Sequence, residues 1–172
     1  MSVIITPTLI AINIIVFFLT QGDEELYYKL GLNSGFLDYG FYWQPFTSMF
    51  MHANLSHLAM NMVVLFQFGY LLENELKIKI RYLILYIVGG LITSLISFEF
   101  IHHFNLHHNL VGASGALSVL FGWFAHKDKN MRGGLIVAML LISFVPLLMG
   151  MNIAWYAHLI GFVIGWIVAL VL

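Results

Sequence analysis

The last 40 residues of the chain, 133–172, contain no aspartate, glutamate, lysine or arginine. A helix of about 20 apolar residues is long enough to cross a hydrocarbon core about 30 Å thick. Pro146 and Gly150 interrupt the run near its middle. The run therefore predicts two membrane-spanning helices, at about 133–149 and 153–172.

The composition of the whole chain supports the same class of protein. Hydrophobic residues make up 61% of the 172 residues and charged residues 9%, whereas soluble domains are about half apolar and a quarter charged. A net charge of −1 leaves no basic surface for a nucleic-acid backbone. The absence of cysteine excludes disulfides, a cysteine nucleophile and thiolate metal sites. We expect a helical membrane protein whose environment is the lipid bilayer and which binds no nucleic acid.

Four further apolar segments precede the C-terminal run. They cover about 3–20, 55–72, 82–98 and 111–125, with a more polar loop at 21–54. Together the segments predict an all-α membrane protein, a bundle of six transmembrane helices that forms one domain over residues 1–172.

The positions of the basic residues predict how this bundle is oriented. Six of the seven lie in two loops, namely Lys77, Lys79 and Arg81 after the second span and Lys127, Lys129 and Arg132 after the fourth. Six spans place both loops on the same side, and positively charged loops are retained in the cytoplasm. Both termini should therefore face the cytoplasm, and the 21–54 loop should face outward.

Three chemically useful side chains are expected at similar depth in the membrane. His57, Ser114 and His158 belong to the second, fourth and sixth spans, which all run from outside to inside. At 1.5 Å per residue, they lie roughly 16 to 23 Å above the inner face. Polar groups at such depth usually face the interior of a bundle. The three residues are therefore candidates for a common site.

Ser114 lies between small residues, in the sequence Gly112-Ala113-Ser114-Gly115. A serine at a helix start has an accessible hydroxyl and neighbouring backbone N–H groups without helical partners, and such N–H groups can stabilise an oxyanion. The alternative is a structural contact between helices, which glycine and serine commonly make in membranes.

His158 shares one helical face with Gly161 and Gly165. This pair of glycines allows another helix backbone to approach closely, and the 112–115 segment is the expected partner. Close approach is what a serine–histidine hydrogen bond of about 2.6–3.2 Å requires. The alternative is a packed histidine bonded to a backbone carbonyl.

His57 and Asn61 are four residues apart and share one face of the second span. Both can donate hydrogen bonds to a developing negative charge, although a polar contact between helices would use the same pattern. Asn54 and Ser56 are expected to cap the start of this span.

Four histidines at positions 102, 103, 107 and 108 lie in a loop expected on the outer side. They suggest a metal-binding or transport protein as an alternative function, or simply a solvated loop.

Glu73 is expected to meet the basic loop or the membrane interface rather than to take part in chemistry.

Taken in order, these motifs resemble those of the rhomboid intramembrane serine proteases in their minimal, prokaryotic six-helix form. The matching motifs are His57-Leu58-Ala59-Met60-Asn61, Gly112-Ala113-Ser114-Gly115 and the segment from Ala157 to Gly165, and the segment from Trp43 to His52 looks like the family's first outer loop. The match covers nearly the whole chain.

The resemblance implies a serine endopeptidase that cleaves transmembrane segments of membrane-protein substrates through an acyl-enzyme. Ser114 would be the nucleophile and His158 the general base, while His57, Asn61 and the N–H of Ser114 would hold the oxyanion, with Gly112 beside them. No cofactor and no metal is implied. The site would open to the outer side of a plasma membrane, and the sequence favours no oligomeric state.

Three positions depart from the family pattern, and one of them is Lys77, which stands where a glycine often follows the glutamate of the second span by four residues. Gln44 stands where the family commonly has an arginine, and Ser118 stands where some members carry an aromatic ring that supports the histidine. The sequence therefore does not indicate what orients His158.

Overall fold

The computed structural model describes residues 4–76 and 79–172. Val3, the expected start of the first span, and Lys77, one of the expected cytoplasmic cations, lie outside the described residues. Regular structure in the described part of the chain is helical, apart from one isolated antiparallel bridge between Leu32 and Leu110.

The chain begins with α1 (Ile5–Thr20) and then forms three short helices, α2 (Glu24–Leu30), α3 (Gly35–Asp38) and α4 (Gln44–Thr47). Two long interrupted helices follow. The first consists of α5 (Leu55–Val64) and α6 (Tyr70–Glu75), which are joined by a π-helical turn (Leu65–Gly69). The second consists of α7 (Lys79–Leu83) and α8 (Gly89–His103), which are joined by another π-helical turn (Ile84–Val88). The last three helices are α9 (Ser114–Lys127), α10 (Lys129–Leu148) and α11 (Trp155–Val168).

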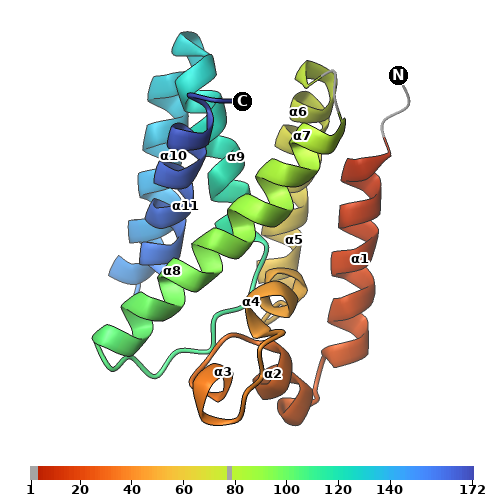
Figure 1. Ribbon diagram of the computed structural model, residues 1–172, viewed down its shortest axis with the longest axis vertical. Helices are drawn as coiled ribbons and strands as arrows, with labels where there is room; N and C mark the ends of the chain where they lie inside the picture. Colours follow the sequence, from red (N-terminus) through yellow and green to blue (C-terminus); the bar gives the residue numbers. More distant parts are fainter. Residues whose placement is uncertain (1–3, 77–78) are drawn as a thin grey trace.

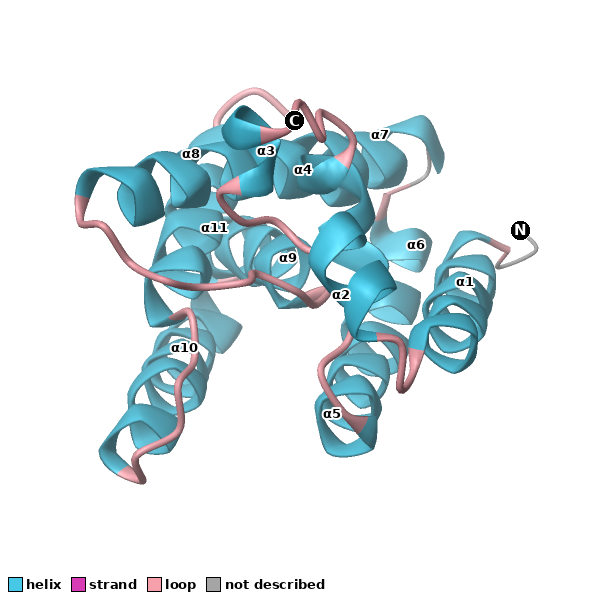
Figure 2. Ribbon diagram, turned by 90° about the horizontal axis from the view of Figure 1, so that it is seen from below, coloured by secondary structure: helices cyan, strands magenta, loops and turns pink. Residues whose placement is uncertain are grey.

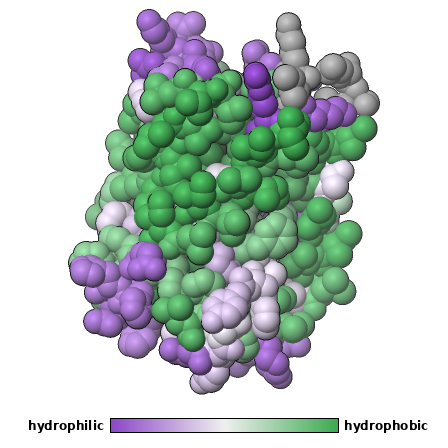
Figure 3. All heavy atoms as spheres, viewed as in Figure 1, coloured by the Kyte–Doolittle hydropathy of each residue, from purple (hydrophilic) through white to green (hydrophobic). Residues whose placement is uncertain are grey.

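Among the described residues, three helices are long and apolar enough to cross a membrane, namely Leu55–Glu75, Lys79–His103 and Lys129–Leu148. The helices α1 and α11 are apolar but shorter. In Figure 3 a broad hydrophobic band covers the middle of the visible face, and hydrophilic side chains gather at its two ends. The fold is thus an all-helical membrane fold.

Several helix limits differ from the expected ranges, each for a local reason. The fourth segment begins at Ser114 rather than 111 because Gly112 has a φ of +122°, which a right-handed helix cannot contain. The fifth begins at Lys129 rather than 133, since Asp128 accepts hydrogen bonds from two backbone N–H groups and caps the helix. The third continues to His103, past its apolar part.

The centre of the bundle is α9. Ten consecutive residues from Ala116 to Ala125 are buried, so every face of this helix is covered by a neighbour. Figure 2 shows α9 and α11 side by side within the bundle, with α10 and α5 standing on separate sides. The helix that begins with Ser114 is therefore held from all directions.

Glu73 holds α1 against α6. Its carboxylate accepts hydrogen bonds from the backbone N–H groups of Ile4, Ile5 and Thr6 at 2.7–2.9 Å and from the Thr6 hydroxyl at 2.8 Å. A carboxylate at a helix N-terminus satisfies N–H groups that lack helical partners and favours the helix dipole. The sequence analysis did not predict this cap, in which the Glu73 side chain holds the start of another helix.

The short helices α2, α3 and α4 gather at one end of the bundle, opposite the end at which α1 begins and the chain finishes (Figure 1). Gln44 is fully buried there and donates to the Tyr28 carbonyl at 3.0 Å. Asn109 donates to the Tyr27 carbonyl at 2.9 Å. The Gln44 bond lies within the 21–54 loop, and the Asn109 bond ties this loop to the segment that leads into Gly112.

Candidate active site

Ser114 and His158 meet at the interface between α9 and α11. The Nε2 atom of His158 lies 3.1 Å from the Oγ atom of Ser114, within hydrogen-bond distance. Ser114 is the first residue of α9, so its N–H is one of the four at a helix start that have no partner within the helix. Both side chains are only partly buried, which leaves them open to a second molecule.

Glycines allow this contact by bringing the two helix backbones together. A Cβ atom at Gly161 would fall 2.5 Å from the Gly115 carbonyl oxygen, and one at Gly165 would fall 1.9 Å from the Val119 carbonyl oxygen. On the facing helix, a Cβ atom at Gly122 would fall 1.9 Å from a carbonyl oxygen of α11. The predicted close approach of the His158 helix is confirmed, and it extends along α9 beyond the expected 112–115 segment.

His57 and Asn61 converge on Gly112, two residues before Ser114. A Cβ atom at Gly112 would lie 2.8 Å from His57 Nε2 and 3.6 Å from Asn61 Nδ2. Asn61 is 5% exposed and donates to the His57 carbonyl at 3.1 Å, whereas the His57 ring is partly exposed. The Asn54 side chain accepts from the His57 N–H at 2.9 Å, which confirms it as the cap of this helix. Two N–H-bearing side chains thus surround the space above Gly112.

Gly112 itself is held by the outer loop. Its N–H donates to the Ser48 carbonyl at 2.9 Å, and its φ of +122° is one that residues with a side chain rarely adopt. Because Gly112 has no side chain, its backbone can adopt this conformation, and the space beside His57 stays open.

One residue at this site was missed by the sequence reasoning. Ser143, from α10, is fully buried, and its Oγ lies 3.3 Å from His158 Nδ1, on the opposite side of the ring from Ser114. The only sequence feature that could have indicated Ser143 is that it carries the single hydroxyl of an otherwise apolar stretch, 135–148. Ser118, at the position of the family's aromatic ring, instead donates its hydroxyl to the Ser114 carbonyl at 2.7 Å.

A family profile described as the Rhomboid domain matches residues 39–172. The chain belongs to the rhomboid family. It is 29% identical over 159 residues to YdcA of Bacillus subtilis, which is named as a candidate rhomboid protease, and the match covers 86% of this chain and 73% of that protein.

Plant rhomboids are similar as well. RHOMBOID-like protein 6, mitochondrial, of Arabidopsis thaliana is 30% identical over 142 residues, and RHOMBOID-like protein 4 is 32% identical over 142 residues. Each match covers 76% of this chain but only 43% and 34% of the respective plant protein. This chain thus spans less than half the length of these two plant relatives.

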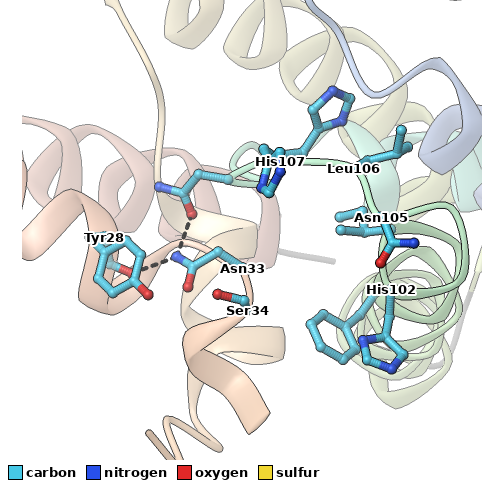
Figure 4. A pocket seen from close by; sticks show the side chains of 11 residues that line it. Tyr28, Asn33, Ser34, His102, Asn105, Leu106 and His107 are labelled. Atoms are coloured by element: carbon cyan, nitrogen blue, oxygen red, sulfur yellow. Dashed lines mark hydrogen bonds between the residues drawn. The ribbon is translucent and has the colours of Figure 1, made fainter. Parts of the chain in front are cut away.

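The four clustered histidines of this rhomboid lie at the end of α8 and in the loop that follows it. His102, His107 and His108 line a cavity of about 340 Å³ between the outer loop and the end of α8, and Figure 4 shows His102 and His107 on separate sides of it. His108 Nδ1 lies 2.9 Å from the Tyr156 hydroxyl. No group of three or more potential metal ligands occurs in 4–76 or 79–172, so the described residues do not support the metal-binding alternative.

His52 lies behind His57, outside the membrane-spanning segments. It is 3% exposed, and its ring is 5.1 Å from the His57 ring, centroid to centroid. Burial, and then the neighbouring His57, lower the pKa of His52 to about 4, although the Phe50 carbonyl offsets part of the effect. His52 is therefore neutral at physiological pH and acts as part of the packing around His57.

Proposed function

We propose that this rhomboid is an intramembrane serine endopeptidase that hydrolyses peptide bonds in transmembrane segments of other membrane proteins. The observation that carries this proposal is the 3.1 Å contact between His158 Nε2 and Ser114 Oγ, on two helices packed through glycines. A nucleophile and a base within hydrogen-bond distance form the core of an acyl-transfer site.

In the first step, His158 Nε2 removes the proton from Ser114 Oγ as that oxygen attacks the carbonyl carbon of the substrate. The resulting tetrahedral intermediate collapses when the protonated imidazole gives its proton to the leaving amine. The C–N bond breaks, and the acyl group remains on Ser114 as an ester. A water molecule, deprotonated by the same imidazole, then hydrolyses the ester and restores the serine.

The negative charge of the intermediate would be stabilised by the groups around Gly112. The N–H of Ser114 points from the start of α9, and His57 and Asn61 approach the same space from α5. Donors already aimed at a developing oxyanion need no reorganisation during the reaction, and the loss of one such donor typically costs about 100- to 1,000-fold in rate.

The six segments that begin with α1, α5, α7, α9, α10 and α11 would each cross the membrane, with both termini in the cytoplasm and the site facing outward. Lys79, Arg81, Lys127, Lys129 and Arg132 then lie on the cytoplasmic side. We assign the protein to a prokaryotic plasma membrane as a multi-pass protein. Water would reach Ser114 from the outer side, where α2, α3 and α4 lie.

A helical substrate segment presents no free peptide bonds, because each backbone group is hydrogen-bonded within the helix. Substrates should therefore carry glycine, proline or other helix-weakening residues near the cleaved bond, and small residues at that bond. Replacement of the helix-weakening residues of a substrate by leucine should slow its cleavage.

The test uses the full chain in detergent or liposomes with a fluorescently labelled single-span substrate that contains such residues. Wild-type protein should cleave the substrate and react with a fluorophosphonate, and Ser114→Ala should abolish both activities. Ser97→Ala is the control, because Ser97 is a buried serine of α8 whose hydroxyl has no hydrogen-bond partner among the described residues. Cleavage that survives Ser114→Ala would contradict the proposal.

A further inference from the structure

We propose that Ser143 is the residue that orients His158, so that this rhomboid positions its base with a serine hydroxyl contributed by α10. The proposal rests on the proposed function, since it assigns Ser143 a role in the same reaction. Ser143 is a positioning residue, because it acts through His158 and does not contact the reacting atoms.

The geometry places the two serines on opposite sides of one imidazole ring. Ser114 Oγ lies 3.1 Å from Nε2, and Ser143 Oγ lies 3.3 Å from Nδ1. The three side chains come from three different helices, α9, α11 and α10, so the ring is held from both of its nitrogen atoms. Rotation of the ring would break both contacts at once.

The remaining neighbour of Ser143 favours one direction for the hydrogen bond to His158. Met139 lies one turn earlier on α10, and Ser143 donates its hydroxyl to the Met139 sulfur at 3.9 Å. A thioether can only accept, and weakly. The Ser143 oxygen therefore keeps its lone pairs for the N–H of His158 Nδ1.

This arrangement selects the tautomer that the reaction requires. A neutral imidazole carries its proton on one nitrogen, and which nitrogen this is depends on the hydrogen bond made by the other. With the proton on Nδ1 and held by Ser143, Nε2 has a free lone pair directed at the Ser114 hydroxyl. A carboxylate performs this task in three-residue serine protease sites, whereas an uncharged hydroxyl avoids an ionised group within an apolar helix.

No other described residue contacts Nδ1 of His158 within hydrogen-bond distance. Ser118, which occupies the position of the family's supporting ring, is engaged with the Ser114 carbonyl. Ser143 is also the only serine or threonine of α10. On the side of the ring away from Ser114, the orientation of the base therefore depends on this one hydroxyl.

The experiment measures kcat and KM for the labelled single-span substrate with wild type, Ser143→Ala and Ser143→Thr. Ser143→Ala should lower kcat about tenfold, the rate equivalent of one neutral hydrogen bond, and should leave KM within about twofold. Ser143→Thr keeps an acceptor oxygen and should restore most of the rate. Ser97→Ala, a buried serine on α8, should match wild type. Ser143→Ala within twofold of wild type, or equal losses in both Ser143 variants, would overturn the proposal.

A second measurement does not depend on activity. The ¹⁵N spectrum of His158, assigned by comparison with His158→Ala, should show a protonated Nδ1 and an unprotonated Nε2 in wild type, and a mixture of tautomers in Ser143→Ala. A wild-type ring with its proton on Nε2 would refute the role of Ser143. Absence of Ser114-dependent cleavage in wild type would instead refute the proposed function, so the two failures are distinguishable.

Discussion

Gly165 of α11 lies so close to Val119 of α9 that a Cβ atom at position 165 would fall 1.9 Å from the Val119 carbonyl oxygen. Because the obstructing atom belongs to a helix backbone, no side-chain rotation can relieve the clash. The lack of a side chain at Gly165 therefore allows the short distance between the two helices, and with it the short distance from His158 to Ser114.

Gly165→Ala should consequently separate α9 from α11. We expect a loss of about 3 kcal/mol in the free energy of unfolding, at the upper end for overpacked sites, and a large loss of fluorophosphonate labelling at Ser114. Gly134→Ala is the matched control, since a Cβ atom at Gly134 of α10 meets nothing within 4 Å. Unfolding in detergent and labelling rate check the two effects. If Gly165→Ala and Gly134→Ala were equally stable, α9 and α11 would move apart without a cost in free energy, and the prediction would be contradicted.

Gly112→Ala should block the proposed oxyanion site. The added methyl would lie 2.8 Å from His57 Nε2, where the substrate oxygen is expected, and the cleavage rate should fall about 100-fold. Gly22→Ala is the control for backbone strain, because Gly22 also has a positive φ of 83° but has no neighbour within 4 Å of such a methyl. If both variants lose activity equally, strain and not the blocked site explains the loss.

Glu73→Gln should weaken the attachment of α1. The amide group would present N–H donors to backbone N–H groups that now bond to a carboxylate, and the free energy of unfolding should fall by about 2 kcal/mol. At temperatures well below unfolding, kcat should stay unchanged because Glu73 is remote from Ser114. Glu75→Gln, at an exposed position, should change stability by no more than about 0.5 kcal/mol. A loss of kcat without a loss of stability would contradict the structural role.

His52 should make the fold sensitive to acid. Its pKa is about 4 in the folded protein and 6.5 without burial, so between these values the unfolded chain binds more protons. Stability should therefore decrease as the pH falls from 6.5 towards 4, by about 3 kcal/mol from this group. His52→Leu should flatten the dependence, whereas His103→Leu, at an exposed position, should preserve it. Unfolding measured across this pH range checks the prediction, and an unchanged slope in His52→Leu would refute it.

Apolar segments and short motifs were sufficient to predict which helices bring the candidate nucleophile and base together. Membrane thickness relates helix length to depth, so His57, Ser114 and His158 could be placed at one level without knowledge of the fold. The pattern from His158 to Gly165 also predicted a close helix contact, because a helical repeat determines which residues share a face. These inferences needed only distances along a helix.

Ser143 and Glu73 could not be assigned in this way. Ser143 contacts His158 because α10 packs beside α11, and Glu73 caps α1 although 67 residues separate it from Thr6. Gln44 likewise contacts the carbonyl of Tyr28 only because the outer loop folds back on itself.

The sequence alone determined the class of protein, the approximate segments and the helices and helical face that carry the candidate nucleophile and base. Only the tertiary structure decided which side chain lies behind the base, what caps the first helix and how closely the central helices approach. The physical reason is that spacing along a helix is set by its own hydrogen bonds, whereas lateral neighbours depend on how separate helices pack.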